Sequence, residues 1–285
     1  MDLHQIARTL DGTVIGRRTL AIPTPGHSRR DRGTSLTFDS AAPGGFLVHS
    51  FNGGDPLAIK AMVAAALGRP AFRPDNRTPP RDSSGHAELA MKLWRAARPA
   101  RGTIVETYLA GRGLQLPPDL HELRFLESCP FGKERHPAML ALMRNIVTNA
   151  PQAVHRTALK PDGSGKAVMA DGGQSKRMLG PAADAVVKLC PDEEVTLGLG
   201  IAEGIENALT AICGGWRPVW AAGSAGAVAS FPVLGGVEAL TVFADPEPAG
   251  VAAARRCAGR WHEAGREATV IRPHGDLDWN ERSLG

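Results

Sequence analysis

The feature that most constrains the fold is an alternation of apolar runs with helix-like segments in the last third of the chain. Apolar runs of strand length stand at 195–202, 217–221, 237–244 and 267–272, and helical patterns stand between them at 204–213, 225–230 and 249–264. Such alternation is typical of a small parallel sheet covered by helices on both faces. The C-terminal part of the chain is therefore predicted to be an α/β domain.

Acidic residues stand where two of these predicted strands end. Glu203 follows the first run, and Asp245 and Glu247 follow the third. Because the carboxyl ends of parallel strands meet at one edge of a sheet, we expect the three carboxylates to converge there. Carboxylate oxygens are ligands that Mg²⁺ prefers, and paired ions can activate an attacking oxygen and neutralise a leaving pyrophosphate. The sequence therefore predicts a site for Mg²⁺, or Mn²⁺, at this edge.

The rest of the chain has an α+β pattern. Within residues 1–70, strand-like runs at 13–22, 35–38 and 45–51 lie between helical patterns at 3–10 and 55–66. A segment rich in proline and polar residues at 71–85 indicates a linker. Residues 86–193 are expected to form a further α+β part, with helices at 86–97, 103–112 and 138–147 and a hairpin at 154–166.

Charge is unevenly distributed along the chain. Residues 1–101 hold 15 Lys and Arg against 8 Asp and Glu, whereas the remainder holds 18 against 21. A basic N-terminal part and an acidic C-terminal part suit a protein that binds a polyanion with the first and carries out metal chemistry with the second. Arg29, Arg30 and Arg32 are the candidates for contacts with the phosphates of such a polyanion. The alternative is an Arg-rich surface that is merely solvated.

Several classes of protein are not expected. No apolar stretch approaches the roughly 18–20 residues that span a bilayer, and the N-terminus lacks the layout of a signal peptide, so we expect a cytoplasmic protein without membrane contact. The 4 cysteines form no C-x-x-C pair, which argues against a disulfide framework. Gly163-Ser-Gly-Lys166 lacks the upstream glycine and the Ser/Thr of a P-loop, which argues against a helicase motor.

The acidic residues resemble the motifs of the Toprim family, the catalytic module shared by bacterial primases, topoisomerases and some nucleases. Glu203 stands in Ile-Ala-Glu-Gly, and Asp245-Pro-Glu247 stands where the family has D-x-D, while Asp276 and Asp278 resemble the segment that closes the Toprim variants of phage and plasmid primases. The resemblance implies a Rossmann-like Toprim catalytic domain over 194–285. It also implies that the first three acids are catalytic and that all five bind metal.

The middle segment resembles the N-terminal half of a primase polymerase core. The hairpin around Arg156, followed by Gly172-Gly-Gln-Ser-Lys176-Arg177, is similar to the basic strand and turn that face the template and the incoming nucleotide in that core. The resemblance implies that Arg156, Lys176 and Arg177 hold nucleotide or template phosphates. The alternative is an ordinary basic hairpin.

The first 70 residues follow the layout of the primase zinc ribbon, but with Ile22, His27, His49 and Asn52 at its ligand positions. Two imidazoles alone cannot build a closed tetrahedral zinc site. We therefore expect a degenerate, zinc-free DNA-binding module in which hydrophobic packing replaces the metal. The two histidines are expected to be structural or to face DNA.

The resemblance implies a primase-like nucleotidyltransferase of a phage, plasmid or other mobile element. Such an enzyme would use NTPs and Mg²⁺ to make short primers on single-stranded DNA, in partnership with a separate replicative helicase. Two alternatives remain open. A Toprim nuclease would cut phosphodiesters with the same acids, and a non-catalytic module would only bind single-stranded DNA.

Overall fold

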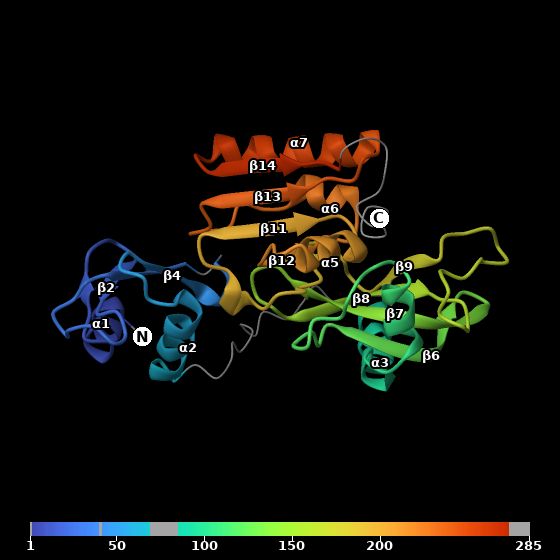
Figure 1. Cartoon of the computed structure of the whole chain (residues 1–285), viewed down its shortest axis with the longest axis horizontal. Helices are drawn as coiled ribbons and strands as arrows, with labels where there is room; N and C mark the ends of the chain where they lie inside the picture. The colour runs from blue at the N-terminus through green and yellow to red at the C-terminus, as the bar shows by residue number, and fades with distance from the viewer. Residues whose placement is uncertain (1, 40–41, 69–84, 274–285) are drawn as a thin grey trace.

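The computed structural model describes residues 2–39, 42–68 and 85–273. In Figure 1 the C-terminal sheet lies above, with the N-terminal sheet and the middle sheet on either side beneath it. Within the described ranges, no helix is both long enough and apolar enough to cross a membrane. Asp276, Asp278 and, apart from Gly85, the predicted linker lie outside the described residues.

The C-terminal sheet is parallel, with strand order β12-β11-β13-β14. Its strands are β11 (Gly198–Ala202), β12 (Val219–Ala221), β13 (Ala239–Phe243) and β14 (Glu267–Ile271). The helices between them are α5 (Ile205–Cys213), α6 (Ala225–Ser230) and α7 (Pro248–Glu263). The predicted α/β alternation is therefore confirmed.

Successive side chains of these strands enter two different cores, because a strand alternates its side chains between the two faces of the sheet. Leu199 and Ile201 of β11 pack in one hydrophobic cluster with residues of α6 and α7. Ala202, the next residue of β11, packs in another cluster with Ile205 and Leu209 of α5. Helices thus cover both faces, as the sequence predicted.

The middle sheet is antiparallel and consists of β5 (Arg98–Pro99), β6 (Leu123–Phe131), β7 (Glu134–Asn145), β8 (Pro151–Ala158) and β9 (Lys176–Leu179), with β10 (Ala185–Val186) paired to β7. One face packs against α3 (His86–Ala96). The other face packs against α4 (Ile104–Ala110) and against α5 of the C-terminal sheet. Because α5 belongs to this cluster, the middle and C-terminal sheets share one core.

The helix predicted at 138–147 is wrong, because this segment belongs to strand β7. Ala138, Leu140 and Leu142 pack toward α3, whereas Met139 and Met143 pack toward α4 and α5. A strand that is buried on both faces shows a continuous apolar run without the period of two. Ala, Leu and Met also favour helices intrinsically, so here tertiary packing overrides local propensity.

The N-terminal module is an antiparallel sheet of β1 (Thr13–Val14), β2 (Thr19–Ile22), β3 (Thr34–Phe38) and β4 (Phe46–Ser50), with α1 (Leu3–Thr9) and α2 (Pro56–Ala66). A short 3-10 turn, η1 (Pro43–Gly45), precedes β4, and a second one, η2 (Asp192–Glu194), lies outside this module, between β10 and β11. A small core of its own includes Ile6, Leu20, Leu36, Val48 and Ile59. The other described elements match the strands and helices predicted for this part of the chain, but the run predicted at 13–22 is divided into β1 and β2, which pair with each other antiparallel.

Hydrogen bonds occupy the place where the zinc-ribbon layout would have its ligands. Asn52 Oδ1 accepts a hydrogen bond from the Thr24 hydroxyl (2.7 Å), and its Nδ2 lies 3.0 Å from Asp31 Oδ2 and 3.3 Å from His27 Nδ1. A hydrogen bond from the Thr24 backbone N–H, aided by Asn52, lowers the pKa of Asp31 to about 2. Of the residues at the ligand positions, Ile22 is buried in the apolar core, whereas His27 and Asn52 are joined by a hydrogen bond. The zinc-free state itself stays a prediction, which elemental analysis of the purified protein checks.

A buried lysine fastens the N-terminal module to the rest of the molecule. Lys60 of α2 is 1% exposed, and its Nζ donates to the backbone carbonyls of Asp192 (2.6 Å) and Val195 (2.8 Å). Lys188 lies in the same joint and pairs with Asp192 Oδ1 at 2.6 Å. Burial lowers the pKa of Lys60 from 10.5 to about 8, although Asp192 and Glu193 partly offset it.

We expect the destabilisation caused by Lys60→Met to grow with pH. Since the folded pKa lies below the unfolded one, the unfolded chain binds the proton more tightly, and this side chain adds stability as pH rises from about 8 toward 10.5. The difference in unfolding free energy between wild type and variant should widen by about 2–3 kcal/mol over this window. Urea unfolding at pH 7 and pH 9.5 measures it, with exposed Lys92→Met as the control. A pH-independent difference would contradict the buried joint.

Candidate active site

A pocket of about 320 Å³ lies where the carboxyl edge of the C-terminal sheet meets the middle sheet. Glu203 and Asp245 line it from the C-terminal side, and His155, Lys166 and Lys176 line it from the middle domain. The two acids arrive there because β11 and β13 are parallel neighbours, with Ala202 opposite Phe243, and each acid follows its strand closely. The structure therefore brings two of the predicted carboxylates to one edge.

The two carboxylates share a crowded negative environment. Burial raises the pKa of Glu203, and the neighbouring charges of Asp245 and Glu247 raise it further. Asp245 Oδ1 accepts a 2.7 Å hydrogen bond from Asn207 Nδ2, in the first turn of α5. This amide orients Asp245 without neutralising it, so the edge retains an excess of negative charge that a cation would relieve.

Glu247 takes a different position from the other two acids. It is the N-cap residue of α7, it is exposed, and it is not among the described residues that line the pocket. Its charge still acts on Glu203, so it lies at the rim of the same site. Glu247 has one methylene more than the Asp that the Toprim motif has at this position, and the preceding Pro246 fixes the backbone φ angle there.

The register of β8 and β9 separates the predicted basic residues. His155 pairs with Met178, Arg156 with Arg177 and Thr157 with Lys176, and paired residues share a face of the sheet. Lys176 therefore lies on the face of His155, toward the pocket. Arg177 also borders the pocket, but its guanidinium forms an ion pair with Asp171 at 2.9 Å.

Arg156 lies on the other face of the middle sheet and is not among the described residues that line the pocket. Its side chain is buried, with its guanidinium 5.1 Å from the centre of the Phe131 ring and bonded to the carbonyls of Pro130 and Met178. Since these contacts hold its guanidinium on that face, the structure does not bring Arg156 together with Lys176 at this site.

The sequence did not single out a buried network at the base of the pocket. Glu206 is 5% exposed, accepts a 2.7 Å hydrogen bond from the Tyr108 hydroxyl and pairs with Lys166 Nζ at 3.0 Å. Burial opposes its ionisation, but Lys166, Lys176 and Tyr108 outweigh this effect and lower its pKa to about 2. Burial also lowers the pKa of the neighbouring His155 to about 4, so this imidazole is neutral near pH 7.

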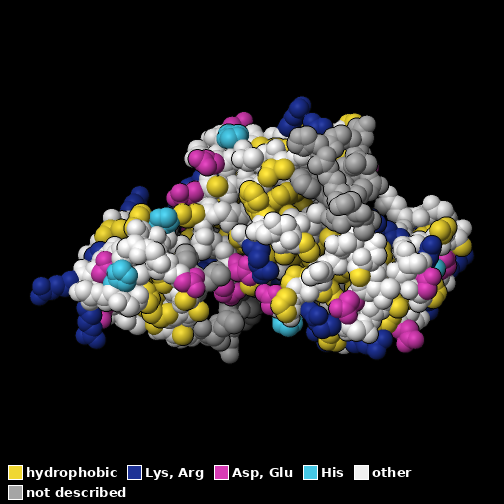
Figure 2. All heavy atoms as spheres, viewed as in Figure 1, with side chains coloured by type: hydrophobic (Ala, Val, Ile, Leu, Met, Phe, Trp, Pro, Cys, Tyr) yellow, Lys and Arg dark blue, Asp and Glu magenta, His cyan; other side chains and the backbone are white. Residues whose placement is uncertain are grey.

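The predicted DNA-binding arginines lie in the loop between β2 and β3, in the N-terminal module and apart from the pocket. Arg29 is exposed and lies 3.9 Å from an oxygen of Asp11, and Arg32 donates to Thr13 Oγ1. The guanidinium of Arg30 has no hydrogen bond or ion pair with the part of the chain that the structure describes. Figure 2 shows basic side chains projecting from the far end of this module.

Two domain families match the sequence. Residues 198–283 match the Toprim domain, and residues 84–189 match a domain of unknown function (DUF7146). The C-terminal part of the chain is a Toprim domain. Among curated proteins, none matches the sequence.

The chain is similar in structure to several solved primases, which cover different shares of it. The zinc-binding and RNA polymerase domains of Aquifex aeolicus primase are 12% identical, with 98% of this chain and 78% of that chain covered and a TM-score of 0.49. A DNA primase domain from Pseudomonas aeruginosa is 14% identical over 69% of this chain and 73% of the other, with a TM-score of 0.46. The primase fragment of bacteriophage T7 primase-helicase protein is 16% identical, with 93% of both chains covered and a TM-score of 0.41.

The acids of the Toprim domain fit a divalent cation in their chemistry. In the described ranges no group of three His, Cys, Asp or Glu side chains stands close enough to hold a metal by itself. One or two carboxylates suffice for Mg²⁺, which keeps several waters and takes further oxygens from phosphates. Glu203 and Asp245 supply two such oxygen donors, and their mutual repulsion favours a cation between them.

Proposed function

We propose that the chain is a primase-type nucleotidyltransferase of a phage, plasmid or other mobile element, which makes short primers on single-stranded DNA. One observation carries the proposal: a single pocket has Toprim carboxylates, Glu203 and Asp245, on one side and the amines of Lys166 and Lys176 on the other. Nucleotidyl transfer requires both, because a triphosphate must be held by cations while a hydroxyl loses its proton.

Each side of the pocket has a distinct role in this proposal. Glu203, whose pKa is raised by burial and by the neighbouring Asp245, accepts the proton of the attacking 3′-hydroxyl. Asp245, oriented by Asn207, and Glu247 at the rim provide oxygen ligands for a cation, with Asp276 and Asp278 as further candidates. When bound there, Mg²⁺ or Mn²⁺ would supply charge neutralisation for the phosphates.

The basic residues hold the substrates. Lys166 and Lys176 bind nucleotide phosphates across the pocket, and Arg177 can join them by exchanging its pairing with Asp171. Arg29, Arg30 and Arg32 hold the template backbone at a distance from the reacting atoms. The proposal includes a separately encoded replicative helicase as a partner.

One assay tests the proposed function against its alternatives. The purified chain is incubated with single-stranded DNA, labelled NTPs and Mg²⁺ or Mn²⁺. We expect oligonucleotides longer than the added NTPs. Shortened DNA would instead identify a Toprim nuclease, and unchanged DNA with retained binding would identify a non-catalytic single-strand-binding module.

Changing the arginines of the β2–β3 loop should weaken DNA binding in a salt-dependent way. Each phosphate interaction that Arg29→Gln, Arg30→Gln or Arg32→Gln removes should reduce the slope of log affinity against log salt by roughly 0.7 for a single strand. Fluorescence anisotropy with a labelled oligonucleotide at four salt concentrations measures the slope, and exposed Arg95→Gln of α3 is the matched control. An unchanged slope in the triple variant would mean that the loop is only solvated.

A further inference from the structure

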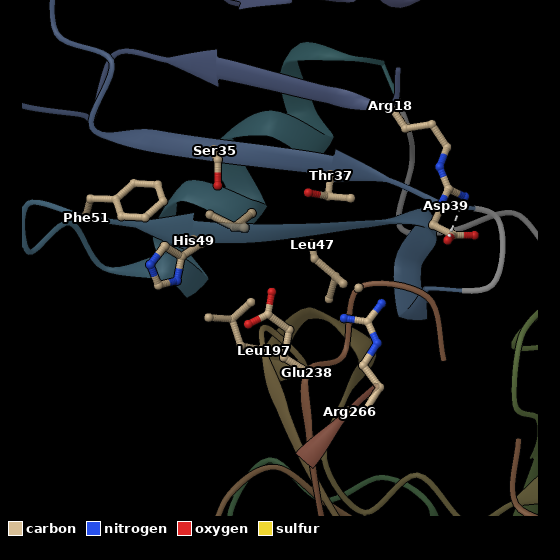
Figure 3. A pocket seen from close by; sticks show the side chains of 12 residues that line it. Arg18, Ser35, Thr37, Asp39, Leu47, His49, Phe51, Leu197, Glu238 and Arg266 are labelled. Atoms are coloured by element: carbon tan, nitrogen blue, oxygen red, sulfur yellow. Dashed lines mark hydrogen bonds and ion pairs between the residues drawn. The ribbon is translucent and has the colours of Figure 1, made fainter. Parts of the chain in front are cut away.

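A second pocket lies at the opposite edge of the Toprim sheet, facing the N-terminal module (Figure 3). Its volume is about 300 Å³, a size at which clefts bind small ligands. Leu197, Glu238 and Arg266, which line it from the Toprim side, directly precede β11, β13 and β14. They therefore mark the amino edge of the sheet, whereas the candidate active site lies at the carboxyl edge.

The N-terminal wall of this pocket carries an aromatic pair beside hydroxyl groups. Ser35 and Thr37 of β3 lie opposite His49 and Leu47 of β4, so these side chains share the face that borders the pocket. Phe51 is 71% exposed, and its ring meets the His49 ring edge-on at 4.3 Å between centroids. The exposed Phe51 ring can stack against a nucleic-acid base. Stacking on an aromatic side chain is open to every base, because every base has a π-face.

Some polar side chains of the pocket have partners among the described residues, and others do not. Arg18 is neutralised by Asp39 at 2.8 Å. By contrast, the side chains of Ser35, Thr37, Glu238 and Arg266 make no hydrogen bond or ion pair within the described ranges. Figure 3 shows Glu238 and Arg266 pointing across the cleft toward β4. Beside the exposed Phe51 ring, the described part of the chain therefore leaves one carboxylate, one guanidinium and two hydroxyls without a partner.

We propose that this cleft binds a nucleotide whose base carries an exocyclic amino group. The base stacks on the exposed face of Phe51, whose ring His49 contacts edge-on. The amino group of the base donates to the Glu238 carboxylate, and the phosphate of the nucleotide pairs with Arg266. A carboxylate accepts from the exocyclic amino group of adenine, cytosine or guanine, whereas thymine and uracil have no such group and their carbonyl oxygens repel it. The inference goes beyond the proposed function and does not depend on the metal-binding edge.

Binding of free nucleotides and of single strands, both in EDTA, tests the site on the full chain. AMP, CMP and UMP are titrated by calorimetry, and dA15, dC15 and dT15 by fluorescence anisotropy. We expect amino-bearing bases to bind about tenfold more tightly than uracil or thymine, and Glu238→Ala to remove that preference. Phe51→Ala and Arg266→Gln should each weaken binding about fivefold or more, whereas Phe51→Tyr and exposed Arg256→Gln should not.

If the substitutions weaken binding of free nucleotides and of oligonucleotides, the cleft is a free-nucleotide site. If they weaken binding of the oligonucleotides alone, the cleft is a site for one nucleotide of a strand. A strand containing 5-iodouracil next to an adenine should also photocrosslink to the tryptic peptide 33–60, which carries Phe51. The proposal is overturned if the dissociation constant for every probe stays within twofold of wild type in all three variants, Phe51→Ala, Glu238→Ala and Arg266→Gln. Since no metal is present, a chain without primer synthesis can still bind here, so the two proposals fail separately.

Discussion

Glu203→Gln should abolish metal-dependent synthesis on single-stranded DNA while leaving the fold intact. Loss of a general base typically costs about 10²–10⁴-fold in rate, and the amide also removes a negative ligand from the cation. The raised pKa of Glu203, caused by burial and then by Asp245 and Glu247, is the physical sign that this carboxylate stands among like charges. Single-turnover product formation in Mg²⁺ and in Mn²⁺ measures the effect.

DNA affinity provides the internal control for this variant. Removing a negative charge from a surface that a polyanion approaches relieves repulsion, so Glu203→Gln should bind single-stranded DNA without metal as tightly as wild type or slightly more tightly. Lys176→Gln, on the opposite wall of the same pocket, should weaken binding instead. If Glu203→Gln retained wild-type turnover, Toprim chemistry would not be the chemistry of this protein.

The acidic edge could be predicted because the information is local. Strand length, the carboxylate after each strand and the parallel connection together place Glu203 and Asp245 at one edge. The basic side of the pocket is harder to predict from sequence, because it depends on the register in which β8 and β9 pair. The resemblance to a primase core indicates Arg156, but one step along β8 reverses the face of the sheet, and His155 lines the pocket instead.

Other features depend on contacts between distant segments. The strand β7 resembles a helix in sequence because it is buried between α3 on one side and α4 and α5 on the other. Strand β6 carries no strong pattern of its own and was not predicted. The joint at Lys60 links residues 132 and 135 positions apart, and no local signal announces it.

One sequence signal indicates the network around Glu206. Glu206 stands in the first turn of α5, three residues after Glu203, on a helix that is otherwise largely apolar. A carboxylate among buried positions requires partners, because an unpaired buried charge is costly. Its partners, Tyr108 and Lys166, come from α4 and from the turn before β9, which only the folded chain brings together.

Glu206→Gln should be among the most destabilising single changes in this molecule. Breaking a buried ion pair by removing one partner costs about 3–5 kcal/mol, and the partial exposure of Lys166 points to the lower end of this range. Urea unfolding at pH 7 measures the free energy, and Glu263→Gln, at the exposed end of α7, is the matched control. A decrease below about 0.5 kcal/mol would contradict the network.

The pH dependence and a second substitution locate the origin of this destabilisation. Since the pKa of Glu206 falls from 4.5 to about 2 on folding, its contribution is fully present above pH 4.5 and disappears as pH falls toward 2. The difference between wild type and Glu206→Gln should therefore shrink from pH 7 to pH 3. Lys166→Met in the Glu206→Gln background should cost less than in wild type, because its ionic partner is already gone. Equal costs in both backgrounds would mean that Tyr108 and Lys176, and not the ion pair with Lys166, hold Glu206 in its charged form.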